Sequence, residues 1–136
     1  MSINYTEHEI LFANDRFYSA FNSTNIKLMD QIWGEENTSC IHPNSYPIYA
    51  RDEIIYSFQE IFNSPHPPMI QCIKPKVRFY GKNALVICIE KIKNNFLFAS
   101  NIYFLNKKDW LIVHHHASVT NIPSIRFKDE SQKTIN

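Results

Sequence analysis

The sequence has only two glycines among its 136 residues and no apolar run long enough for a transmembrane helix. Scarce glycine leaves few positions that adopt a positive φ at low cost, which favours regular elements joined by turns of asparagine and proline. The segment Met1 to Ile10 carries Glu7, His8 and Glu9 where a signal peptide would need an apolar core. We therefore expect a cytoplasmic protein without a membrane partner.

The sequence also lacks an excess of charge of either sign. Its 14 basic and 13 acidic residues are spread along the chain and give a net charge of +1. Proteins that bind nucleic acid or anionic membranes carry a concentrated basic patch. We expect neither as a partner.

Cysteine is sparse, with three residues whose spacing matches neither a zinc ribbon nor a disulfide framework. We expect Cys40, Cys72 and Cys88 to be reduced and mostly buried small apolar residues. No basic neighbour is evident that would lower the pKa of Cys40 or Cys88, so neither is expected to act as a nucleophile.

The length and the hydrophobic content of 44% indicate one globular domain. No internal repeat, low-complexity tract or linker divides the chain. We place the domain at residues 1–122 and expect the polar, charged tail at residues 123–136 to fray.

Three amphipathic helices are predicted in the first half of the chain. Residues 3–23 repeat apolar side chains at spacings of three and four, with charges on the other side. Residues 23–34 predict a shorter helix, capped by Thr24 or Asn25, that forms a hairpin with the first. Residues 51–64 predict the third helix, which must end before the prolines that follow.

The rest of the chain is typical of strands. A brief strand at residues 38–49 should break at Pro43, because proline removes a ladder donor. Four runs rich in Ile, Val, Phe and Tyr follow at residues 70–80, 84–93, 96–105 and 110–120. Their short separators predict an antiparallel meander.

Both faces of this sheet are largely apolar, as one strand shows: Ala84, Val86 and Cys88 alternate with Leu85, Ile87 and Ile89. Neither face can be left to water at low cost. We therefore expect helices on one face and a second subunit of a homodimer on the other. The predicted architecture is an α+β domain in which a curved antiparallel sheet wraps three N-terminal helices and leaves a cone-shaped cavity.

Five segments resemble, in order and spacing, the SnoaL-like branch of the nuclear-transport-factor-2-like superfamily. They are "FYSAFNSTNIKLMDQIW", "CIHPNSYPIYARDEIIYSFQEIF", the acidic end of "ALVICIEKI", "ASNIYF" and "WLIVHHHASV", and the resemblance spans about residues 8–121. Members include ketosteroid isomerases, polyketide cyclases and the association domain of calcium/calmodulin-dependent kinase. The resemblance implies a single-domain, cystatin-like conical roll, a cavity and a dimer, with no metal and no cofactor.

The sequence departs from this pattern at two places. Ala50 stands where the family would have glycine before the position of Arg51. No residue can be matched to the catalytic aspartate and tyrosine of the isomerases. The resemblance therefore indicates the fold more strongly than isomerase activity.

The candidate site consists of three polar residues in phase with apolar strand faces. Strand periodicity puts His114 and His116 on one face and His115 on the other, together with Leu111, Val113 and Ala117. The pocket arginines of the kinase association domain correspond to the positions of Glu90 and Asn101, and this resemblance implies that His115 points inward.

In that arrangement Glu90 and His115 are the candidate catalytic pair, because burial raises the pKa of a carboxyl group and a nearby imidazole can share its proton. Asn101 could orient a ligand carbonyl. Trp33, His42, Tyr49, Phe58 and Phe62 are the other candidate ligand-binding residues, the aromatic ones as apolar walls. The same aromatics could equally be plain core, and Glu90 could lie at a solvated rim or only satisfy a polar core.

Three alternatives stay open from the residues alone. The chain could bind or convert a small apolar molecule in the cone. It could instead be a non-catalytic association module whose cavity is incidental. A metal site is the third, since His114 and His116 have His-x-His spacing and His42 would supply a further ligand, although no acidic residue lies near the pair in sequence. We expect His114 and His116 to pack in the dimer interface, bonded to backbone or to Tyr103 across it.

Overall fold

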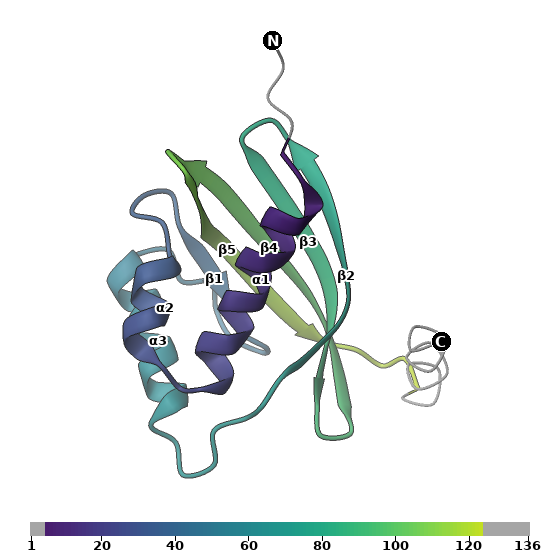
Figure 1. Ribbon diagram of the computed structural model, residues 1–136. Helices are drawn as coiled ribbons and strands as arrows, with labels where there is room; N and C mark the ends of the chain where they lie inside the picture. The colour runs from purple at the N-terminus through teal and green to yellow at the C-terminus, as the bar shows by residue number, and fades with distance from the viewer. Residues whose placement is uncertain (1–4, 124–136) are drawn as a thin grey trace.

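The computed structural model describes residues 5–123, which form three helices and one five-stranded sheet (Figure 1). The helices are α1 (Glu7–Asn22), α2 (Ile26–Ile32) and α3 (Arg51–Phe62). The strands are β1 (Ser39–Ile41), β2 (Gln71–Tyr80), β3 (Asn83–Ile92), β4 (Asn95–Asn106) and β5 (Asp109–Val119). The predicted single α+β domain is confirmed. The tail predicted at residues 123–136 lies, apart from Pro123, outside the described residues.

The strand order in the sheet is β1-β5-β4-β3-β2. Strands β2 to β5 form the predicted antiparallel meander. The short edge strand β1, whose direction the sequence left open, pairs parallel to β5 with Cys40 opposite His115, so the five-stranded sheet is mixed. The direction of an edge strand depends on where the preceding helices deliver the chain, which strand periodicity does not report.

The helix starts follow local chemistry. The Thr6 side chain accepts a hydrogen bond from the Glu9 amide at 3.4 Å, and Asn25 caps α2 in the same way through the Leu28 amide at 3.1 Å. Ala50 precedes α3 with φ −69° and ψ 131°, an extended conformation that any residue adopts. Alanine therefore fits where the family pattern would have glycine.

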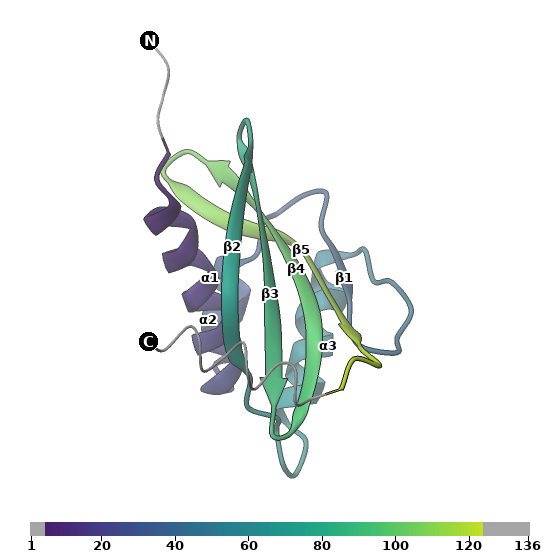
Figure 2. The same ribbon diagram turned by 90° about the vertical axis from the view of Figure 1, so that its right-hand side faces the viewer.

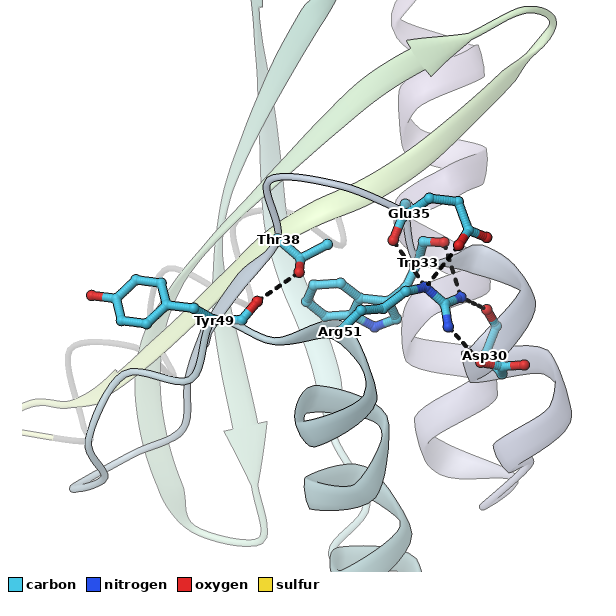
Figure 3. A network of polar contacts seen from close by, with 7 residues as sticks. Asp30, Trp33, Glu35, Thr38, Tyr49 and Arg51 are labelled. Carbon is cyan, nitrogen blue, oxygen red and sulfur yellow. Dashed lines mark hydrogen bonds and ion pairs between the residues drawn. The ribbon is translucent and has the colours of Figure 1, made fainter.

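Arg51 ties the end of α2 to the start of α3 (Figure 3). Its Nε donates to the Gly34 carbonyl at 3.0 Å, and its Nη1 donates to the Asp30 carboxylate at 2.8 Å. Its Nη2 donates to the carbonyl oxygens of Asp30 and Trp33. One guanidinium group thus satisfies carbonyl groups that a helix end leaves without intrahelical partners.

All three helices lie on one face of the strongly twisted sheet (Figure 2). Ala84, Val86 and Cys88 point toward the helices and are buried, in keeping with strand alternation. The opposite face, here called the outer face, has no described helix or strand against it. Ile87, Phe98 and Phe104 lie on it and are 49%, 38% and 40% exposed. None of the described helices is long and apolar enough to cross a membrane.

Candidate functional site

The helix-facing side of the sheet carries three buried polar residues from three neighbouring strands. Glu90 of β3, Asn101 of β4 and His115 of β5 retain only 2%, 0% and 4% exposure. Asn101 and His115 are direct cross-strand partners, and their side chains are joined by a 2.6 Å hydrogen bond between Oδ1 and Nδ1. The structure therefore brings the three predicted residues together, but through intermediates.

Tyr18 of α1 connects Glu90 to this group. Its phenol donates to Glu90 Oε2 at 2.6 Å and accepts from Asn101 Nδ2 at 3.2 Å. Because the phenolic proton is given to Glu90, the 3.2 Å contact with Cys88 Sγ is one in which the thiol donates. Glu90 and His115 are thus linked through Tyr18 and Asn101 and do not bond each other directly.

Asn14, one helical turn before Tyr18, holds the centre of the network. Its Oδ1 accepts from the Tyr103 hydroxyl at 2.8 Å and from Asn101 Nδ2 at 3.0 Å. Its Nδ2 contacts Cys72 Sγ at 3.6 Å. Both amide protons of Asn101 are consumed within the network, so Asn101 has no proton left to orient a ligand carbonyl, and that predicted role is wrong.

A cavity of about 150 Å³ lies between this network and the helices. Glu90 and His115, the two ends of the hydrogen-bonded chain, both line it. Most of the remaining wall is apolar, including Phe17, Phe58 and Ala117. The His115 ring packs against Phe17 with centroids 4.9 Å apart. An apolar hollow with two polar groups at one wall is typical of small-molecule sites.

Burial moves the pKa values of both polar groups toward their neutral forms. It raises the pKa of Glu90 from 4.5 to about 7, and the hydrogen bond from Tyr18 partly opposes this rise. It lowers the pKa of His115 from 6.5 to about 3, with a smaller contribution from the positive charge of His42. Near neutral pH the carboxyl group therefore exchanges a proton readily, whereas the imidazole is neutral.

Two of the other predicted ligand-binding residues line the cavity, namely Phe58 and His42. The His42 ring packs edge-on against Phe58 at 5.0 Å, and its Nε2 bonds Ser57 Oγ at 2.8 Å. Burial lowers the pKa of His42. His42 therefore belongs to the cavity wall.

The remaining three predicted wall residues do not line this cavity. Trp33 and Phe62 are buried behind Phe58, with ring centroids 6.1 and 6.3 Å from it, and belong to the core. Tyr49 is 68% exposed, and Figure 3 shows its ring directed away from Trp33. It precedes α3 in an extended segment, where only its carbonyl is held, by Thr38 Oγ1 at 2.8 Å. The prediction that Tyr49 forms an apolar wall is wrong.

A β-bulge in β5 changes the predicted faces of the histidine segment. The β4–β5 register shifts at Ile102 and Tyr103, so that Ile112 is buried and Leu111 lies opposite Phe104 on the outer face. An extra residue in one strand reverses the alternation beyond it. Simple alternation predicts that Leu111, Val113 and Ala117 share the inward face with His115. In the structure Leu111 and Val113 lie on the outer face, and only Ala117 of the three lies inward.

His114 and His116 occupy the outer face. His114 Nδ1 bonds Ser39 Oγ at 2.6 Å, and the two imidazole centroids lie 6.4 Å apart. His42 lines the cavity on the other side of the sheet and cannot complete a metal site with them. Residues 5–123 contain no cluster of three His, Cys, Asp or Glu side chains arranged for a metal. Tyr103 points inward to Asn14, so the predicted bond from these histidines to Tyr103 is wrong.

Sequence reasoning missed Asn14, Tyr18 and Tyr103. Asn14 lies one turn from Ile10 and about one turn from Phe17, in phase with the buried face of α1. A polar residue in phase with an apolar helix face is the signal that could have identified it. Nothing comparable marks Tyr18, because tyrosine is common at the border of such a face.

Comparison with known proteins assigns the family. The model of the SnoaL-like domain family matches residues 10–122, and the chain belongs to this family. No curated protein matches the chain.

Solved structures share the fold at low sequence identity. A candidate dehydratase of the NTF2-like family from Streptomyces avermitilis aligns with a TM-score of 0.76 at 22% identity, covering 83% of this chain and 94% of its own. A candidate calcium/calmodulin-dependent protein kinase type II association domain from Thiobacillus denitrificans gives 0.75 at 22%, covering 89% and 100%. An uncharacterised protein with a cystatin-like fold from Caulobacter vibrioides gives 0.72 at 13%, covering 93% and 96%. These likenesses show the NTF2-like, cystatin-like fold.

Proposed function

We propose that this protein binds a small apolar molecule in the cavity and that Glu90 can exchange a proton with it. The observation that carries the proposal is that both ends of one buried hydrogen-bonded chain, Glu90 and His115, line a single apolar hollow. A purely structural polar network has no need to end at a cavity wall.

Glu90 and His115 have different roles in this proposal. A general acid or base works best when its pKa lies near the operating pH, and the pKa of Glu90 is about 7. The pKa of His115 is about 3, so its neutral ring is a weak base and serves to accept a hydrogen bond. Isomerase- or cyclase-like proton transfer, the chemistry that the family resemblance suggests, would therefore rely on Glu90.

The volume limits the size of the ligand. A cavity of about 150 Å³ is smaller than the roughly 300–1,000 Å³ of sites for drug-sized molecules. An engineered cavity of about 150 Å³ is known to hold benzene. A ligand with a single ring is thus the size class that we propose.

Native mass spectrometry of protein isolated from cells tests this function. We expect a bound small molecule in the wild type and its loss in Ala117→Leu, which fills the cavity from β5. Ala84→Leu is the matched control, because Ala84 is equally buried on the same face but does not line the cavity. The proposal fails if neither added toluene nor added p-cresol binds the wild type or the control when both are folded by circular dichroism.

A second candidate function, association through the outer face, is supported by a different observation. A hollow of about 580 Å³ opens there, lined in part by Glu35, Phe104 and Val113. The exposed Ile87, Phe98 and Phe104 lie on the same face, and contiguous exposed apolar residues mark interaction surfaces. We propose a homodimer through this face, compatible with a ligand in the cavity on the other side.

The three free thiols support the cytoplasmic location that we also propose.

A further inference from the structure

The polar groups of the cavity determine which ligands it can recognise. Only three lining side chains carry polar atoms, namely Glu90, His115 and His42. Whether each one donates or accepts a hydrogen bond depends on where its protons lie, and the surrounding bonds determine those positions.

The proton on His115 follows from Tyr103. The buried Tyr103 hydroxyl has Asn14 Oδ1 as its acceptor, which orients the Asn14 amide. That oxygen also accepts from Asn101 Nδ2, which orients the second amide and presents Asn101 Oδ1 to His115. His115 Nδ1 must therefore carry the proton and donate it. His115 Nε2 then has a lone pair and bonds no described residue.

His42 is an acceptor by the same reasoning, and Glu90 is an acceptor when its carboxyl group is ionised, above its pKa of about 7. The Ser57 hydroxyl donates to the Ile54 carbonyl at 2.6 Å, so Ser57 Oγ accepts the proton of His42 Nε2 and leaves His42 Nδ1 as an acceptor. Glu90 Oε2 is occupied by Tyr18, and no described residue donates to Oε1. Trp33 Nε1 is a buried donor without a partner among the described residues, but Trp33 does not line the cavity.

We propose that the cavity selects a single-ring apolar molecule carrying a hydrogen-bond donor, a hydroxyl or an amine, over a ring of equal size that can only accept. This inference rests on the proposed function, since it concerns the same cavity. The ionised Glu90 carboxylate and the lone pair of His115 each need a donor when water is displaced from the hollow. An acceptor-only ligand leaves both unsatisfied, and an unsatisfied buried polar group is costly. The cavity also disfavours anionic ligands, because a ligand anion would face the Glu90 carboxylate and no cationic side chain lines the wall beside it.

Binding of three probes tests the selection. p-Cresol and anisole are isomers that differ in whether the oxygen can donate, and toluene has no oxygen. At pH 8, where Glu90 is ionised, we expect p-cresol to bind at least about tenfold more tightly than anisole by calorimetry. Equal affinities of p-cresol, anisole and toluene would overturn the selection while leaving the cavity as a binding site. Failure of all three to bind would overturn the proposed function itself.

Glu90→Gln should abolish or reverse the preference. Tyr18 still needs an acceptor, so the carbonyl of the introduced amide would face it and the new NH₂ group would face the cavity. We expect the ratio of the p-cresol affinity to the anisole affinity to fall to about one or below. Glu60→Gln, an exposed carboxyl on α3, is the control and should keep the wild-type ratio. A ratio unchanged in Glu90→Gln contradicts the inference.

Nitrogen-15 NMR of histidine-labelled protein tests the proton assignment without any variant. We expect His115 to be the neutral tautomer with its proton on Nδ1. A proton on Nε2 would give the cavity a donor and overturn the inference, whatever the variants do.

Discussion

Tyr18 donates its phenolic proton to Glu90 Oε2 at 2.6 Å, across the boundary between the first helix and the third strand of the sheet. This bond favours the ionised carboxylate, whereas burial favours the neutral acid. Burial has the larger effect, and the result is a carboxyl group that titrates near neutrality inside an apolar wall.

Tyr18→Phe should raise the pKa of Glu90 above its present value of about 7, because it removes the interaction that opposes burial. The carboxyl carbon of Glu90, followed by carbon-13 NMR through a pH titration, measures the change. Tyr56→Phe, an exposed tyrosine on α3, should leave the titration unaltered. An unchanged or lower pKa in Tyr18→Phe would show that the bond does not act on the carboxylate.

Glu90→Gln should change how stability depends on pH. The pKa of Glu90 is higher in the folded state than its ordinary 4.5, so the folded protein binds this proton more tightly, and stability declines as pH rises from about 4.5 to about 7. The full decline is about 3 kcal/mol. The stability of the wild type relative to Glu90→Gln should therefore fall across this window in urea unfolding experiments, and a flat difference would contradict the raised pKa.

His115 contributes the opposite slope. Its pKa is lowered in the folded state to about 3, so its contribution to stability is present above pH 6.5 and is lost as pH falls toward 3. In Glu90→Gln this slope is no longer offset, and the free energy of unfolding should rise between pH 4.5 and 6.5. Glu60→Gln should retain the flatter wild-type profile.

Ile87→Lys should weaken self-association, because it puts a charge at the middle of the apolar outer face, where Ile87 is 49% exposed. Sedimentation velocity should show a dimer for the wild type and a monomer for the variant. Tyr56→Lys, which replaces an exposed apolar residue on α3, should remain dimeric. A monomeric wild type at micromolar concentration would contradict the proposed dimer.

Gly34→Ala should destabilise the fold by about 1–3 kcal/mol through overpacking. A Cβ at Gly34 would lie 2.9 Å from Val113 Cγ1, and the stiff valine side chain has few ways to move. Val113→Ala removes that methyl group. The double variant should thus be more stable than the sum of the two single effects, measured by urea unfolding, and simple additivity would place the cost elsewhere.

The sequence by itself determined the helices, the strands and the antiparallel order of the four long strands. Apolar spacing along residues 7–22 and 51–62 specified two helices, because a helix must bury one stripe. Alternation in β3 placed Glu90 on the same face as Val86 and Cys88, and therefore inside. These features are local, since they depend on the period of one element at a time.

Only the tertiary structure decided what those side chains meet. The bulge in β5 places Leu111 and Val113 on the outer face. An extra residue in a strand cannot be predicted from the alternation of apolar residues. Tyr18 and Asn14 reach Glu90 and Asn101 because α1 packs across β3 and β4, a contact over more than half the chain. Hydrogen bonds between distant elements depend on how the elements pack. The position of each buried proton follows from the sequence of hydrogen bonds in the network, which the composition of the chain does not specify.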